Sequence, residues 1–410
     1  MDFHNIYEKT LNELPWELLA DVFVKKLEAK DVKVTKKQKK AISIELQKGN
    51  YEKLPIKNWR WWDKRDITIN LTEEDLDNIL SRLEKFNSEL PERTIKMVEE
   101  IAPNVSEALL KNMDKATKDE RKSITKFREH IWKTWEESFS LLHLLIDIAS
   151  RAGENAIAIS NMDDEEPSNL KSVILRLQAR GVQVAREILA LMEAGFADGA
   201  TARWRTLHEI TVISLFISDH GEECAIRYIE HDSIAIYKGT KTYQEYCENL
   251  GYEPIPSDEY AEIKKAYEEC ITKYGEEYDK DYGWAAPYLK GRCNFREIEN
   301  AIEINNLRPF YKYACQTVHA GPRGIFHKVG LMNEDIILFN ASDYGFAEVG
   351  RNTAMSLTLL SAQLLTHCLV LDMIISGFVM NIIASKTSNS FYATQENIEQ
   401  SVDTEINDTR

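Results

Sequence analysis

The chain has 410 residues and a formal net charge of −16 at pH 7, with 43% hydrophobic and 29% charged residues. This length is enough to bury the cores of two or more domains, which excludes a small scaffold that depends on disulfides or a metal for stability. The 17 Gly and 10 Pro are few for the length, and their scarcity favours long helices.

The acidic balance is reversed near the N-terminus. Residues 22–65 contain fourteen Lys and Arg against five Asp and Glu. Tyr51, Trp59, Trp61 and Trp62 lie among these cations, and aromatic rings between cations are typical of surfaces that bind single-stranded nucleic acid. We therefore expect RNA or another single-stranded nucleic acid as a partner for residues 22–65. The alternative is a solvated helix face followed by a tryptophan anchor that packs on the main body.

The domain organisation follows from helix and boundary signals. Thr72 is placed as the N-cap of a helix with Leu76, Ile79 and Leu83 at helical spacing, and a long helix is expected over residues 126–151. Residues 152–170 carry the Gly, Asn, Asp and Pro of a boundary. The prediction is a basic, mostly helical domain over 1–150, a core domain over 170–384 and a polar, disordered tail over 385–410.

The core domain is expected to be almost unbroken helix. Gly195 ends the first of its helices and Asp198 caps the second. The expected segments are 171–194, 199–219, 221–238, 257–275, 295–304, 309–319 and 346–384. Because strands do not alternate with helices, the predicted fold class is all-α, an antiparallel helical bundle.

One apolar stretch has the length of a membrane span. Residues 352–371 contain no Asp, Glu, Lys or Arg, but eight of these twenty residues are polar. Lipid would leave those polar groups unpaired, so the prediction is a buried central helix and no membrane association.

Several catalytic and cofactor signatures are missing from the sequence. It has no phosphate-binding loop, no dinucleotide-binding glycine motif, no nucleophile elbow, no zinc-protease helix and no Glu-x-x-His pair of a di-iron bundle. The six cysteines include no C-x-x-C pair, and the first residues lack a signal-peptide pattern. We therefore expect no metal, no cofactor, free thiols and a cytoplasmic location.

The segment ARWRTLHEIT, residues 202–211, concentrates charge in a helix that otherwise has an apolar pattern. Arg205, His208 and Glu209 stand at i, i+3 and i+4 and therefore share a face. Charges flanked by aliphatic residues cost several kcal/mol to desolvate unless they are paired. Two interpretations stay open: a buried Arg205–Glu209 network that fixes the helix register, or a polar pocket that supplies an acid or a base.

Two further segments carry candidate residues. In NLRPFYKYACQTVHAGPRG, the residues Tyr311, Cys315 and His319 fall on one helical stripe, and His319 lies in the last turn, where it either titrates near neutral pH or caps the final carbonyl groups. In DYGWAAP, Asp281 and Tyr282 lie in a compact turn that either lines a site or closes one end of the bundle.

Four motifs, in this order, resemble a family of bacterial all-helical proteins of unknown function: ARWRTLHEI at 202–210, RYIEHDSIAIYK at 227–238, DYGWAAP at 281–287 and FYKYACQTVHAG at 310–321. The resemblance covers residues 170–375. The polar residues that match are Arg205, Glu209, His231, Asp281, Tyr282 and His319. Where the family often has a serine, this chain has Cys315.

That family is similar in architecture to the helical ribonuclease and nucleotide-binding domains called HEPN. Their nucleases use an Arg and a His with four to six residues between them, and Arg203 and His208 have four. However, Trp204 stands where these nucleases usually have a small polar residue. Five positions also separate two side chains by about 140° around a regular helix. The resemblance implies a HEPN-like bundle, and no catalytic role rests on this pair alone.

The leading hypothesis is a bacterial HEPN-like RNA-binding protein or ribonuclease effector in stress or phage defence. In it, His208 or His319 is the general base, and Arg203 or Arg205 stabilises the phosphorane charge beside Glu209. The candidate binding residues are His231, Asp281, Tyr282, Tyr311, Trp59, Trp61 and Trp62.

The alternative hypothesis is a non-catalytic helical module that binds a small ligand or a partner helix, with a structural Arg205–Glu209 pair. In either case an exposed apolar stripe on a bundle suggests a homodimer.

Overall fold

The computed structural model describes residues 3–50, 67–160, 168–319, 321–332, 336–367 and 370–408. Within these ranges the chain forms thirteen α-helices, three short 3-10 helices and no strand, which confirms the all-α prediction. The chain divides into two compact units, Met1–Asp119 and Glu120–Arg410. Tyr51, Trp59, Trp61 and Trp62, predicted to bind nucleic acid, lie outside the described residues.

The first unit is built from α1 (Phe3–Glu28), α2 (Lys36–Gln47) and α3 (Glu73–Lys111). Thr72 caps α3 as expected, because its hydroxyl accepts from the Asp75 N–H while the Asp75 carboxylate accepts from the Thr72 N–H. A small core joins α1 to α2 around Phe23, Ile42 and Leu46. The lysines of this unit are mostly exposed on the outside of that core.

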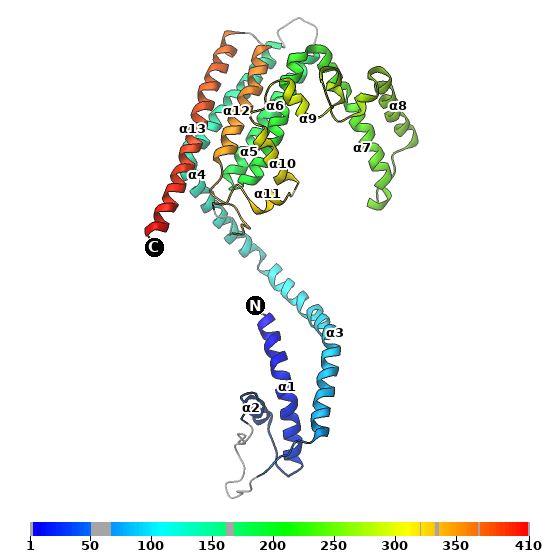
Figure 1. The fold of residues 1–410 in the computed structure, drawn as a ribbon, viewed down its shortest axis with the longest axis vertical. Coiled ribbons are helices and arrows are strands. Elements are labelled where there is room, and N and C mark those ends of the chain that lie inside the picture. Colours follow the sequence, from blue (N-terminus) through cyan, green and yellow to red (C-terminus); the bar gives the residue numbers. More distant parts are fainter. Residues whose placement is uncertain are drawn as a thin grey trace. The chain divides into compact units, whose positions relative to one another are not determined.

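The second unit surrounds a larger core. Its helices are α4 (Met113–Ser160), which starts in the first unit, α5 (Asn169–Glu193), α6 (Ala197–Glu230), α7 (Asp232–Tyr246), α8 (Ser257–Tyr274), α9 (Phe295–Ala301), α10 (Arg308–Val318), α11 (Pro322–Phe326), α12 (Ala347–Thr366) and α13 (Leu371–Asp408). Three 3-10 helices, η1 (Glu248–Leu250), η2 (Glu276–Asp279) and η3 (Gly283–Tyr288), connect them. Helices α5, α6 and α12 pack against one another in the centre, and α13 lies along α12 (Figure 1).

The joint between α5 and α6 reverses the chain direction. Gly195 adopts a φ of +88°, which suits glycine, so the expected helix end is confirmed. Phe196 takes the N-cap position instead of Asp198. The Asp198 carboxylate accepts a hydrogen bond from the Val329 N–H at 3.0 Å, so it holds the loop that follows α11.

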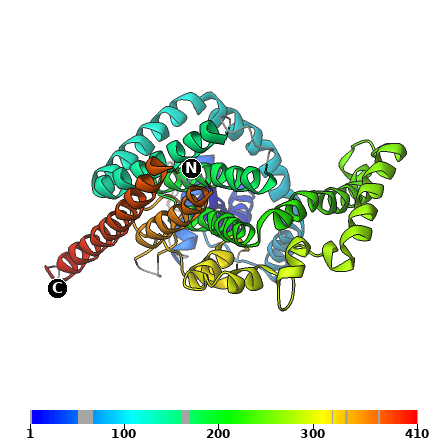
Figure 2. The same cartoon turned by 90° about the horizontal axis from the view of Figure 1, so that it is seen from above.

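Helix α6 bends sharply at Gly221, where φ is +75°. The chain then continues into α7 and α8, which pair with each other. Figure 2 shows this pair extending away from the bundle formed by α5, α6 and α12. Arg203, Arg205, His208 and Glu209 precede the bend and therefore lie in the bundle, whereas His231 follows it.

Helix α12 is the buried central helix predicted for the apolar stretch, although it ends at Thr366. Its polar residues Asn352, Thr353, Ser356 and Ser361 are buried inside protein. In the part of the chain that the structure describes, no helix combines the length and apolarity needed to cross a bilayer.

The predicted domain boundaries differ from the observed ones. The two units divide between Asp119 and Glu120 rather than near residue 150. The reason is that α4 contributes Ile131, Trp135 and Phe139 to the core of the second unit. Their periodicity marks an amphipathic helix, but it does not say which core the helix joins.

Residues 385–408 are helical in α13 and not the expected frayed tail. Phe391 is fully buried, and its ring lies 5.8 Å from Trp135 and 6.1 Å from Phe139, centroid to centroid. Burying such a ring contributes about 1.5–3 kcal/mol. Phe391 therefore contributes to docking the segment, together with hydrogen bonds such as those of Ser390 to Ser138 and of Tyr344 to Glu399.

Candidate functional site

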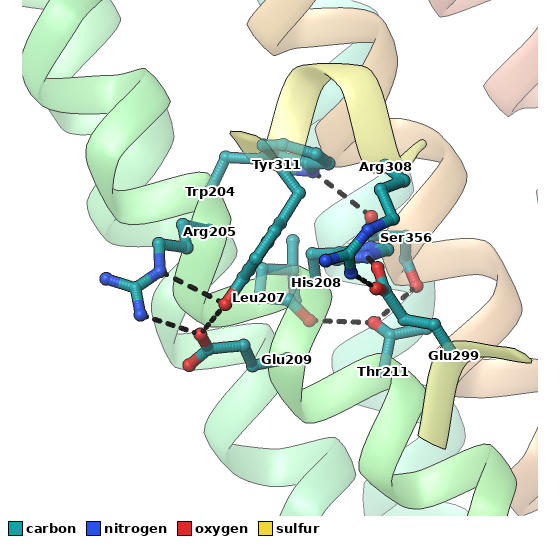
Figure 3. Close-up of polar contacts among 10 residues, drawn as sticks. All are labelled: Trp204, Arg205, Leu207, His208, Glu209, Thr211, Glu299, Arg308, Tyr311 and Ser356. Carbon is teal, nitrogen blue, oxygen red and sulfur yellow. Dashed lines mark hydrogen bonds and ion pairs between the residues drawn. The ribbon is translucent and has the colours of Figure 1, made fainter. Parts of the chain in front are cut away.

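The charged segment of α6 contributes to two adjacent polar groups (Figure 3). His208 points toward Glu299 of α9 and Arg308 of α10, and these three residues are called the buried triad. Arg205 and Glu209 meet at the hydroxyl of Tyr311 on α10, and these three are called the half-buried triad. The i, i+3, i+4 spacing places the three α6 side chains on one face, as expected.

The buried triad is closed to solvent around His208 and Glu299. These side chains are 1% and 0% exposed, and His208 Nε2 lies 2.9 Å from Glu299 Oε1. Glu299 also forms an ion pair with Arg308. A carboxylate in an ion pair accepts hydrogen bonds, so His208 Nε2 carries the proton and donates it.

The charge state of His208 follows from its surroundings. Burial lowers the pKa of His208 to about 4; the Glu209 carboxylate opposes this shift and the Arg308 guanidinium adds to it. The negative charge of Glu299 is already balanced by Arg308. His208 is therefore neutral near pH 7. Its imidazole holds the Glu299 carboxylate in place by a hydrogen bond and does not reach solvent.

The half-buried triad is partly open. Tyr311 Oη donates to Glu209 Oε1 at 2.6 Å, and Arg205 Nη2 lies 3.0 Å from the same oxygen. Arg205 and Glu209 are 26% and 25% exposed. Burial alone lowers the pKa of Arg205, but its contacts with Tyr311 and Glu209 raise that pKa above its usual value. The pKa of Tyr311 is raised, chiefly by burial and by its hydrogen bond to Glu209. Arg205 and Tyr311 therefore both keep their protons near pH 7, so neither acts as a base there.

The ring of Tyr311 links the two triads. The Arg205 guanidinium lies 5.5 Å from its centroid and the Arg308 guanidinium 5.9 Å. The His208 ring is also 5.5 Å away. Such cation–π contacts add to the attraction between α6 and α10.

Trp204 connects the buried triad to a neighbouring cavity. Its ring lies 5.3 Å from the His208 ring, and its Nε1–H donates to Ser356 Oγ of α12 at 3.1 Å. Trp204 also borders a cavity of about 820 Å³ between α6, α10, α11 and α12. Trp204 therefore lies between the buried triad and this cavity.

The structure brings some predicted site residues together and separates others. Tyr282 of the turn before η3 lies near the half-buried triad, and burial together with the Glu209 carboxylate raises its pKa to about 12. Arg203 faces another direction, where it pairs with Glu187 of α5. Arg203 and His208 thus meet different partners, in agreement with their angular separation on the helix.

The remaining candidates lie apart from the triads. His231 Nε2 lies 3.0 Å from the carbonyl oxygens of Tyr278 and Lys280, so it ties the end of α6 to η2, and burial lowers its pKa. Asp281 is exposed. His319 occupies the C-cap position of α10 and is exposed. Among the described residues, no hydrogen bond or ion pair joins the His319 side chain to either triad.

Sequence analysis missed Glu299 and Arg308. A signal for Glu299 exists, because Phe295, Ile298 and Ile302 recur at helical spacing and place Glu299 on their apolar face. A charge on such a face requires a partner. Arg308 directly precedes Pro309, and this pair indicates only the start of a helix, so nothing in the local sequence marks Arg308 as a partner of Glu299.

Across the described ranges, no three His, Cys, Asp or Glu residues gather in a way that could hold an ion. The polar side chains that line the cavity are Thr201, Lys312, Tyr313, Gln316, Arg323, Glu348 and Asn352.

Both triads lie in the segment that matches a known sequence family. Residues 171–336 match a family of unknown function, DUF5677. This match fits the expected resemblance to an uncharacterised family. The matched segment contains all but the first two residues of α5 and the whole of α6 to α11. No curated protein and no solved structure matched the chain. The DUF5677 match thus covers most of the cavity wall, but α12 and α13 lie beyond it.

Proposed function

We propose that the helical unit of residues 120–410 binds a small organic molecule in the cavity beside Trp204 and does not act on it chemically. The observation that carries this proposal is the closed hydrogen bond between His208 and Glu299, whose side chains are 1% and 0% exposed. A general base must reach the proton that it abstracts. His208 instead donates its proton to Glu299 and holds α6 against α9.

The cavity itself supports binding. Its volume of about 820 Å³ lies within the range of about 300–1,000 Å³ typical of ligand pockets. Trp204, Phe310, Val349 and Pro309 supply apolar wall, and a few polar residues are placed among them. A mostly apolar wall with few polar groups is the usual arrangement of a small-molecule site.

A cavity-filling variant tests this function. Thr201 lines the cavity and is 9% exposed, so Thr201→Phe is expected to occupy the space of a ligand. Small molecules that co-purify with the wild-type protein are identified by mass spectrometry. They are compared with the molecules that co-purify with Thr201→Phe, after the melting temperatures of the two proteins are shown to be equal. The proposal expects one or more molecules retained by the wild type alone. Equal retention, or cleavage of RNA that is lost in His208→Gln, would contradict it.

A second candidate function is RNA binding by the first unit, with a HEPN-like ribonuclease or effector role for the second. The observation that favours it is the group of exposed lysines on α1, α2 and their connection: Lys25, Lys33, Lys36, Lys37 and Lys40. Cations that contact phosphates give affinity that falls steeply with salt. A ribonuclease role then depends on His319, because His208 is closed to solvent.

Salt dependence separates the two candidates. The RNA hypothesis expects labelled single-stranded RNA to bind the full chain at low salt, to dissociate as salt rises, and to bind less to a variant with Lys36, Lys37 and Lys40 changed to Gln. A second gel of the same samples detects cleavage, which His319→Ala must abolish. Salt-independent or absent binding rejects RNA as the partner.

A further inference from the structure

One face of α13 is apolar and uncovered in the part of the second unit that the structure describes. We call it the apolar face of α13, and its residues are Leu371, Ile374, Ile375, Phe378, Val379 and Ile382. Leu371 and Phe378 are the most open of them, at 71% and 70% exposed. Single exposed apolar residues are common on proteins, but a continuous apolar face marks an interaction surface.

The opposite face of the same segment already packs against α12. Met373 and Met380 are 1% exposed. Gly377 approaches α12 so closely that a Cβ there would lie 2.7 Å from Leu365 Cδ1. A helix that is apolar all round is typically buried on all sides. The first turns of α13 therefore have the composition of a buried helix, whereas only one side of them is covered within the described residues.

The spacing of the exposed residues indicates a second helix as the partner. Four of them follow one another at steps of four, three and four positions: Leu371, Ile375, Phe378 and Ile382. This is the spacing of the residues that form the seam between two coiled helices. Helices that lie on a bilayer surface instead carry Lys and Arg beside their apolar face, and residues 371–385 contain neither.

The charges at the two ends of the apolar face indicate which helix fits. Asp372 and Lys386 are both exposed, and no charged residue lies between them in the sequence. Two heptads separate them, so they lie on the same side of the helix. A second copy of α13 that runs in the opposite direction places its Lys386 beside Asp372 at one end of the face and its Asp372 beside Lys386 at the other. A parallel copy would oppose like charges instead.

We infer that α13 pairs with α13 of a second copy of this chain in the antiparallel direction and forms the interface of a homodimer. A two-fold axis brings the same face of both chains together, so the interface must be complementary to itself, as the apolar face of α13 is. The sequence suggests a homodimer without indicating a face. This inference does not depend on the cavity beside Trp204, and α13 lies beyond the segment that matches DUF5677.

Sedimentation equilibrium of the full chain tests the inference. We expect the wild type to have twice the mass of one chain at micromolar concentration. Phe378→Glu is expected to raise the dissociation constant of the dimer at least about a hundredfold, because it buries an unpaired charge in the seam. Phe326→Glu is the matched control, since Phe326 of α11 is 71% exposed, and it is expected to leave the dimer intact.

Both of these side chains are exposed in the separate chain, so neither variant is expected to lose helix content, which circular dichroism checks. For the same reason, substitutions of Phe378 are expected to leave the unfolding of the separate chain unchanged. Stability depends on association only at concentrations near or above the dissociation constant of the dimer. Unfolding is therefore measured well below that concentration.

Reversal of one charge tests the direction of the two helices. Asp372→Lys is expected to weaken the dimer at least about threefold, because it places two cations together at each end of an antiparallel pair. Combining Asp372→Lys with Lys386→Asp is expected to restore the affinity. A parallel pair opposes like charges both in the wild type and in Asp372→Lys, so it predicts no loss for the single substitution.

The inference is overturned if the full chain keeps the mass of one chain at about 0.1 mM, or if Phe378→Glu dimerises as tightly as the wild type. Equal affinities of Asp372→Lys and the wild type would overturn the antiparallel direction. A monomeric wild type that binds phosphatidylcholine vesicles, with binding lost in Phe378→Glu, would identify a bilayer surface as the partner of this face and would overturn the inference as well.

Discussion

His208 Nε2 lies 2.9 Å from Glu299 Oε1, although 91 positions separate these residues in the chain, and both side chains are buried. Arg308 pairs with the same carboxylate. Three helices, α6, α9 and α10, therefore meet at one charged group. Removing the Glu299 carboxylate leaves the buried imidazole of His208 and the guanidinium of Arg308 without their common partner. The free-energy cost of such unpaired groups exceeds the net stabilisation that the intact ion pair provides.

We expect Glu299→Ala to lower the free energy of unfolding of the second unit by about 3–5 kcal/mol. The matched control is Glu262→Ala, an exposed glutamate of α8, with an expected change within about 0.5 kcal/mol. Denaturation in urea, followed by helix content, measures both. A loss below that of the control would show that the buried triad does not hold the helices together.

The pH dependence of stability provides a separate test of His208. Its folded pKa of about 4 lies below the ordinary value of 6.5, so the unfolded state binds the proton more readily. The stability from neutral His208 is therefore present above pH 6.5 and is lost as the pH falls toward 4, by about 3 kcal/mol in all. We expect His208→Gln to be less stable than the wild type at pH 7, with this difference shrinking toward pH 4.5. A difference that is constant with pH would mean that His208 does not titrate in this way.

Tyr311→Phe tests the half-buried triad. The change keeps the ring between the two arginines but removes the hydroxyl that donates to Glu209. We expect a loss of about 1.5–3 kcal/mol, the range for hydrogen bonds to charged groups. Tyr246→Phe, at a tyrosine that is 50% exposed, is the control. Equal melting temperatures of the two variants would contradict a structural role for the Tyr311 hydroxyl.

Phe391→Ala tests whether the end of α13 belongs to the core. Phe391 is fully buried against Trp135 and Phe139, and we expect a loss of about 3–5 kcal/mol. Phe378 lies on the same helix and is 70% exposed, so Phe378→Ala is expected to have almost no effect. Thermal unfolding of both variants gives the comparison. A wild-type melting temperature for Phe391→Ala would restore the interpretation of residues 385–408 as a tail.

Local patterns in the sequence were sufficient for much of the fold. The spacing of Arg205, His208 and Glu209 placed them on one face, Gly195 marked the end of α5, and Thr72 marked the start of α3. Each of these features depends on residues within one or two helical turns, where geometry is set by the backbone itself. The scarcity of Gly and Pro favoured long helices, and the absence of strands alternating with helices predicted the all-α class.

The partners of those residues depended on the tertiary structure. Sequence alone left open whether the charges of α6 formed a pocket or a buried network. The answer for His208 came from Glu299 and Arg308, which long-range packing brings to α6. The cavity also needs four helices, since Trp204, Phe310, Arg323 and Asn352 come from different ones. Helical periodicity determined which face of its helix each side chain occupies. The packing of distant helices decided which residues that face contacts. Contacts between distant segments leave no local pattern in a single sequence, so only the tertiary structure could show them.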